Sequence, residues 1–173
     1  MTAAPAIEDT GEITVAVEAA AWDDAIPSLD THVREVVEAA LAAASPHLGP
    51  AGIAVILTDD EAVRLLNRDW RGKDQPTNVL SFPAAGLGPG ERPAPVLAGM
   101  PLELGDIVLA HETCRREAEA QGKLLLHHLD HLLVHGVLHL LGHDHQDEEE
   151  AGRMERLEIA ILARRGILDP YAS

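Results

Sequence analysis

A strongly apolar segment rich in histidine, predicted to be helical from Leu124 to Leu141, constrains this chain more than any other feature. Seven of the ten histidines lie between residues 127 and 145. The spacing His-x3-His-x2-Gly-x2-His places His135 and His139 on one face of a helix, one turn apart. Two imidazoles in this arrangement can bind the same metal ion.

His145 is the third candidate ligand, and it requires the helix to end. On a continuous helix it would lie too far along the axis from His135. Gly142 can adopt the positive φ that ends a helix, so we expect the chain to turn back there and bring His145 to the other two. Three protein ligands leave the fourth tetrahedral position open for water, which is typical of catalytic zinc.

Other histidines in the segment could compete as ligands. Five of them form an i, i+4 series at positions 127, 131, 135, 139 and 143. We assign His131 to a buried hydrogen-bonding role behind the site, and we expect His32, His127 and His128 to be solvated. Three imidazoles favour one Zn²⁺ per chain, although nickel, copper or iron would also bind.

The same spacing occurs in the long zinc-peptidase motif H-E-x-x-H-x-x-G-x-x-H, so the helix is metzincin-like. The glutamate that serves as general base in that motif is replaced by Gly136. Peptide hydrolysis by that mechanism therefore lacks its base. A zinc peptidase remains the weaker alternative.

The apolar patterns predict a mixed α/β fold in a single layered domain spanning residues 1–173, with a small mixed four-stranded sheet and about five helices. Strands are expected at 13–17, 53–57, 77–82 and 105–110. Helices are expected at 31–44, 59–68, 112–121, 124–141 and 147–165. Residues 1–11 read as a loose tail, and residues 84–101 as a long Gly/Pro-rich loop inside the domain.

Composition limits the partners of the chain. Thirteen Lys and Arg against 29 Asp and Glu give a formal net charge of −16, which should repel nucleic acid on average. Four of the bases fall between Arg64 and Lys73, where we would look for an anionic partner. An aromatic content of 2% argues against the base-stacking platforms of single-strand binders.

The single cysteine, Cys114, excludes an intramolecular disulfide and a four-cysteine zinc site. The first residues lack the basic and apolar regions of a signal peptide, and no apolar run approaches about 18 residues. We therefore expect a cytoplasmic protein that does not associate with membranes.

Two long motifs resemble those of the YbeY family, the bacterial rRNA maturation endoribonucleases. Residues 135–145 read HGVLHLLGHDH, similar to the family's H-G-x-L-H-L-x-G-[aromatic]-D-H. Residues 67–83 match N-x-x-[aromatic]-R-x-K-D-x-P-T-N-V-L-S-F-P, residues 104–108 match L-G-D-I-x, and residues 169–171 match the family's usual ending. Two features depart from the pattern. His143 replaces an aromatic residue and could be a stray ligand, and the loop at 84–101 is long.

The resemblance implies a metal-dependent endoribonuclease specific for single-stranded RNA. It would act on the 3′ end of 16S rRNA and in ribosome quality control, with the small ribosomal subunit and its proteins as partners. The family's zinc ligands carry over to His135, His139 and His145, and its functionally important arginine to Arg71. Zinc can lower the pKa of bound water to about 7 and supply hydroxide to attack the phosphodiester, while Arg71 grips phosphate.

Asp144 is the second candidate catalytic residue beside Arg71. It could orient a histidine, cap the next helix or act as the base, and the sequence leaves these roles open. A non-catalytic ribosome assembly factor, whose metal holds the C-terminal helices together, is the main alternative function. Because the net charge is unfavourable, we expect a local RNA-binding surface around Arg64, Arg68, Arg71 and Lys73, with the acid-rich first 50 residues on the far side.

Overall fold

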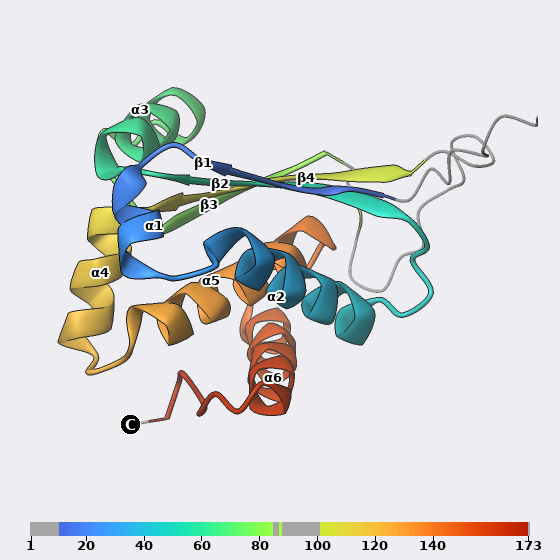
Figure 1. The fold of residues 1–173 in the computed structure, drawn as a ribbon. Helices are drawn as coiled ribbons and strands as arrows, with labels where there is room; N and C mark the ends of the chain where they lie inside the picture. The colour runs from blue at the N-terminus through green and yellow to red at the C-terminus, as the bar shows by residue number, and fades with distance from the viewer. Residues whose placement is uncertain (1–10, 85–86, 88–100, 173) are drawn as a thin grey trace, which may run out of the picture.

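Four strands form one sheet in the order β1-β2-β4-β3 (Figure 1). In the computed structural model, which describes residues 11–84, 87 and 101–172, β1 (Ile13–Val17), β2 (Ala51–Thr58) and β4 (Leu102–Ala110) run parallel. The edge strand β3 (Val79–Pro83) pairs antiparallel with β4. The predicted mixed α/β class is confirmed. The expected tail at 1–11 and loop at 84–101 lie almost entirely outside the described residues.

The two central strands are apolar along their length because both faces of the sheet are covered. β2 and the second half of β4 are almost continuously buried, as expected for strands between two layers. Ile107 of β4 is fully buried and lies in the main core. The expectation that residues 105–110 form a strand bordering the histidine-rich helix is confirmed.

Helices cover the two faces unequally (Figure 1). α2 (Leu29–Ala44), α5 (Leu125–Leu140) and α6 (Glu148–Arg164) pack together on one face. α3 (Asp60–Arg71) lies on the other face, over a small apolar cluster. α5 contacts α2, α6, β3 and β4, which explains why it is apolar around most of its circumference.

The described residues form six helices, one more than the sequence analysis predicted. The additional helix, α1 (Ala20–Ala25), is too short to show a helical apolar stripe. It carries Trp22, which is fully buried and donates its indole N–H to the carbonyl oxygen of Thr58 at 2.9 Å. A tertiary contact therefore holds this turn.

α3 and α4 (His111–Ala120) bind each other at their first turns. The Asp60 carboxylate accepts hydrogen bonds from the backbone N–H and the hydroxyl of Thr113, at 2.9 and 2.8 Å. In return, Glu112 accepts from the backbone N–H of Asp60 at 2.7 Å. Each helix thereby satisfies a free N–H of the other, and α3 is held in the position from which its last residue, Arg71, reaches the site.

Two of the three histidines expected to be solvated are not. His128 is buried, with Nε2 2.8 Å from Glu117, and His32 lies 2.5 Å from the buried Asp130. His127 is half-buried. His128 packs against α4 and His32 packs against α5, so these two rings face neighbouring helices. No helix among the described residues is long and apolar enough to cross a membrane.

Candidate metal centre

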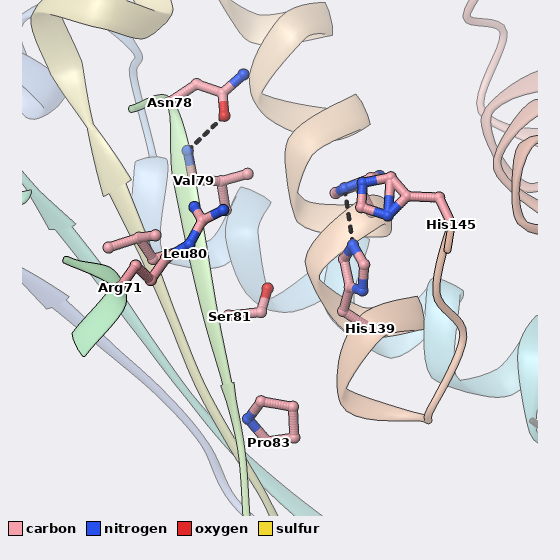
Figure 2. Close-up of a pocket in the computed structure, with 9 residues that line it drawn as sticks. Arg71, Asn78, Val79, Leu80, Ser81, Pro83, His139 and His145 are labelled. Carbon is pink, nitrogen blue, oxygen red and sulfur yellow. Dashed lines mark hydrogen bonds between the residues drawn. The ribbon is translucent and has the colours of Figure 1, made fainter. Parts of the chain in front are cut away.

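Three imidazoles converge at the C-terminal end of α5. His135, His139 and His145 each offer a ring nitrogen, and these atoms lie within 4.8 Å of one another. The Nε2 atoms of His135 and His139 are 3.0 Å apart (Figure 2). Three convergent imidazole nitrogens suit zinc or a similar transition metal.

The turn after α5 returns His145 to the other two. Gly142 has φ 95°, and its N–H donates to the carbonyl of His139 at 3.0 Å. The N–H of His143 then donates to the carbonyl of Leu138, also at 3.0 Å. This pair of bonds ends the helix at a residue in the left-handed region, and Figure 2 shows the chain after it bringing His145 back.

A buried carboxylate from α6 orients the first histidine. Glu158 is fully buried, and its Oε1 lies 2.5 Å from Nδ1 of His135. Its Oε2 contacts Nε2 of His131 at 3.1 Å and accepts from the Tyr171 hydroxyl. Burial opposes the charged form of Glu158, but the hydrogen bonds from these three side chains outweigh it and lower its pKa to about 2. The carboxylate therefore accepts a hydrogen bond from the Nδ1–H of His135, which leaves Nε2 of that ring facing the other two histidines.

The sequence analysis missed Glu158, although α6 carried a signal. Met154, Glu158, Ile161 and Leu162 occupy the buried face of the helix at helical spacing. A carboxylate on an apolar face needs a partner, because burying an unpaired charge is costly. His131 takes part in this network, so its predicted hydrogen-bonding role is confirmed.

His139, the second of the three histidines, is in the neutral form that metal binding requires at neutral pH. Burial, followed by the nearby His135 and His145, lowers the pKa of His139 to about 4. The ring is then neutral at pH 7, so a nitrogen lone pair is available for coordination.

Asp144 lies beside the third histidine. Its Oδ1 accepts from the backbone N–H of His145 at 2.8 Å and lies 3.1 Å from Nδ1 of that ring. Of the roles left open for Asp144, capping of the next helix is excluded, because Asp147 is the N-cap of α6 and accepts from the N–H of Glu150 at 2.8 Å. The described lining of the cleft does not include Asp144, so its position fits orientation of His145.

The three histidines form one wall of a cleft of about 320 Å³, and β3 forms the opposite wall (Figure 2). The β3 side is lined by Asn78, Val79, Leu80, Ser81 and Pro83. Asn78 is fixed there by two bonds. Its Oδ1 accepts from the N–H of Val79 at 2.6 Å, and its Nδ2 donates to Glu117 at 2.9 Å. The same Glu117 oxygen contacts the buried His128, which gives that histidine a supporting role the sequence did not indicate.

Arg71 lies in the same cleft, as expected, although it is distant from the histidines in sequence. It is the last residue of α3, and Gly72, with φ 70°, ends the helix and turns the chain toward β3. The buried Asn67 holds this turn through its Nδ2, which donates to the carbonyl of Gln75 at 2.7 Å.

The other bases of the predicted cationic cluster are less available. Arg64 binds Glu61 and Asp74, and Arg68 binds Asp69 at 2.9 Å. The salt bridges among the described residues include neither Arg71 nor Lys73. Within this cluster, the positive charge without a carboxylate partner therefore lies at the end of α3 and in the turn after it.

His143, the possible stray ligand, points elsewhere. It lines a separate surface hollow with Arg153, Arg156 and Leu157, and burial lowers its pKa. It is not a member of the three-histidine group found in the described part of the chain.

The model of the family described as "Endoribonuclease YbeY" matches residues 11–166. The chain belongs to the YbeY family. The resemblance inferred from the two motifs is confirmed. Endoribonuclease YbeY of Paramagnetospirillum magneticum is 51% identical over 162 residues, which cover 94% of this chain and 96% of that protein. The same-named protein of Rhodopseudomonas palustris is 52% identical over 158 residues, covering 91% of this chain and 80% of the relative.

A solved structure shares the fold. The solution structure of TM1509 from Thermotoga maritima matches with a TM-score of 0.55 and 19% identity, covering 94% of this chain and all of that one. At this identity the match shows the shared fold alone.

Proposed function

We propose that this chain is a metal-dependent endoribonuclease that cleaves single-stranded RNA during rRNA maturation, at the 3′ end of 16S rRNA, and in ribosome quality control. One observation carries the proposal. A single cleft presents three convergent imidazoles opposite Arg71, a cation with no carboxylate partner among the described salt bridges. The YbeY family model and the relatives named endoribonuclease support this reaction class.

Zinc is the proposed metal, held by His135, His139 and His145, one ion per chain. The residues fit it, since His139 is neutral at pH 7 and Glu158 directs His135 Nε2 toward the shared space. A bound zinc ion supplies Lewis-acid chemistry and lowers the pKa of a coordinated water toward about 7.

Arg71 is proposed to bind the scissile phosphate. Its planar guanidinium can donate two parallel hydrogen bonds to phosphate oxygens. Negative charge increases on those oxygens in the transition state of phosphodiester hydrolysis. The Arg71 guanidinium therefore stabilises the transition state more than the ground state. Asp144 is proposed to hold the His145 ring by its contact with Nδ1, and the general base is not assigned to it.

The position of Gly136 argues against peptidase chemistry. A Cβ atom at this residue would lie 3.0 Å from two side-chain carbons of Ile107, so the site faces the sheet core. A glutamate here, as in the peptidase motif, would have to displace the Ile107 side chain or point away from its usual direction.

The net charge of −16 disfavours binding of free RNA and therefore affects where the reaction would take place. We propose that the protein acts in the cytoplasm on rRNA in the small ribosomal subunit, where ribosomal proteins supply contacts that the isolated chain lacks. Free RNA would then bind weakly.

Metal analysis combined with RNA cleavage tests the proposal. The purified protein is expected to bind one zinc and to cleave single-stranded RNA, and His135→Ala should lose both properties while staying folded. The alternative of a non-catalytic assembly factor predicts that His139→Ala unfolds the C-terminal helices and that the wild type cleaves no RNA. A folded, zinc-loaded wild type without cleavage activity would refute the nuclease.

A further inference from the structure

Trp70 is 72% exposed, whereas the other tryptophan, Trp22, is fully buried. An indole left in water at this level buries little of its large apolar surface. Trp70 directly precedes Arg71, which lines the cleft, so the two side chains leave the last turn of α3 at adjacent positions.

The ring also contacts the strand that forms the cleft wall. Its centroid lies 6.1 Å from that of Phe82, at an interplanar angle of 64°. Phe82 stands between Ser81 and Pro83, which line the cleft, and strand side chains alternate between faces. Trp70 therefore sits across the single edge strand β3 from the histidines, with Arg71 in the cleft on the other side.

The chemistry beside the ring is that of a polyanion site. Arg71 and Lys73 have no carboxylate partner in the described salt bridges, while the two arginines earlier in α3 are paired. Proteins that bind single strands combine cations for the backbone with aromatic rings on which bases stack. The low aromatic content of the chain argues against a platform of several rings. A single exposed ring, that of Trp70, is still enough to stack one base next to the residue proposed to bind phosphate.

We propose that Trp70 is a stacking platform for a nucleobase of single-stranded RNA, adjacent to the phosphate bound by Arg71. The inference rests on the proposed function, because it takes the same RNA ligand, with Trp70 across β3 from the cleft. Stacking on an aromatic side chain is sequence-tolerant, since every base presents a π-face. Trp70 would thus favour unpaired RNA over a duplex, whose bases are already stacked on one another.

The test uses the fluorescence of the full-length, metal-free protein. Because Trp22 is buried, quenching by an added strand reports on Trp70. The probes are a short 2′-O-methyl oligoadenylate, which resists cleavage, and an abasic strand of equal length and charge. The oligoadenylate should quench the indole and bind between about 5-fold and about 150-fold more tightly than the abasic strand.

Variants separate stacking from general apolar contact, with binding followed by anisotropy of a labelled strand. Trp70→Leu should lower oligoadenylate affinity to that of the abasic strand, and Trp70→Tyr should restore most of it. Leu168→Ala, which removes a side chain 88% exposed and outside the cleft lining, should change nothing. Melting curves check that each variant is folded, and the wild-type quenching measurement depends on no variant.

The outcomes distinguish this inference from the proposed function. Equal affinity for the two strands, absence of quenching, or unchanged binding by Trp70→Leu would overturn the stacking platform, even if zinc-loaded wild type cleaves RNA. Base-dependent quenching without any cleavage by the zinc-loaded wild type would instead overturn the nuclease and leave the platform standing.

Discussion

Arg71 differs from the other two arginines of α3 because the described salt bridges give it no carboxylate partner. Arg64 and Arg68 lie on the same helix, but each is bound to a carboxylate, which cancels much of its charge for a distant ligand. Arg71 lines the cleft, and the described salt bridges leave it without such a partner. Of these three arginines, Arg71 is therefore the one proposed to bind phosphate.

Replacing this guanidinium should slow the reaction strongly. We expect Arg71→Ala to lower single-turnover cleavage of single-stranded RNA by about 100-fold, because a preorganised donor to the transition state is lost. Arg71→Lys should recover only part, since an ammonium cannot make the paired bonds of the planar fork. Arg68→Ala is the matched control and should stay within about 3-fold of wild type. Equal losses in Arg68→Ala and Arg71→Ala would contradict the assignment.

The lowered pKa of His139 makes the stability of the metal-free protein depend on pH. The folded state holds this ring neutral down to about pH 4, below its usual value of 6.5, so the unfolded state binds more protons in between. The free energy of unfolding should therefore fall as pH drops through this window, by about 1–3 kcal/mol from this group. Urea unfolding of the wild type and of His139→Gln measures it.

The variant has no titratable ring at this position, so its unfolding free energy should change less between the same two pH values. If the two proteins lose the same stability on acidification, another group is responsible.

At the level of elements, the centre depends on α6 as much as on α5. Glu158 reaches across from α6 to His135, and Tyr171 beyond α6 binds the same carboxylate. α5, which carries two of the proposed ligands, is thereby fixed to α6, which carries none of them.

Loss of this support should weaken metal binding without removing a ligand. We expect Glu158→Gln to lower zinc affinity by about 10- to 100-fold, because the His135 tautomer is no longer enforced. Tyr171→Phe should have a smaller effect in the same direction. Competition with a chromophoric chelator gives the affinities, and Glu155→Gln, at an exposed position of the same helix, is the control. Unchanged affinity in Glu158→Gln would show that the contact does not position the ligand.

The packing of α5 on β4 leaves no room at Gly136. Gly136→Ala would place a Cβ 3.0 Å from Cδ1 and Cγ2 of the fully buried Ile107. Overpacking should exceed the gain in helix propensity, for a net loss of about 1 kcal/mol in unfolding free energy. Gly152→Ala on α6 meets only the end of Arg156 and should stabilise instead.

A double-mutant cycle identifies the cause. Ile107→Val removes the Cδ1 atom, so Gly136→Ala should cost less in that background than in the wild type. A cost that is independent of residue 107 would place the strain elsewhere.

Sequence patterns identified the elements whose determinants are local. The i, i+4 spacing of His135 and His139 predicts a shared helix face, and Gly142 predicts the turn that returns His145. The convergence of the three rings could therefore be expected from the sequence. Glu158 and Asn78 could not be placed, because their partners lie on other elements and only the packing of α6 and α4 brings them together. The same holds for α1, which is stabilised by the burial of Trp22 rather than by its own sequence.

At the scale of the whole molecule, the acid-rich N-terminal segment is only partly separated from the cleft. β1 lies at the sheet edge opposite β3, so this part of the acid-rich N-terminal segment is far from the cleft, as expected. α2, in contrast, packs against α5 on the cleft side of the sheet. The negative charge is thus not confined to the far face.

Salt dependence measures how much positive charge the cleft offers. With Arg71 and Lys73 as the available cations, binding of a non-cleavable single strand should weaken with a slope of about −1.4 in log affinity against log salt. Arg71→Ala should bring the slope to about −0.7. A slope several times steeper would mean that further bases contact the backbone, and anisotropy titrations over a range of salt concentrations decide between the two.

The order of the elements along the chain also has a consequence for synthesis on the ribosome. Arg71 and the β3 wall are made first, then the three imidazoles, and Glu158 only with α6. A nascent chain that stops before α6 carries every predicted contact to RNA and metal but not the carboxylate that holds His135. The carboxylate that orients His135 is therefore the last part of the candidate centre to be synthesised, after nearly all of the fold has emerged.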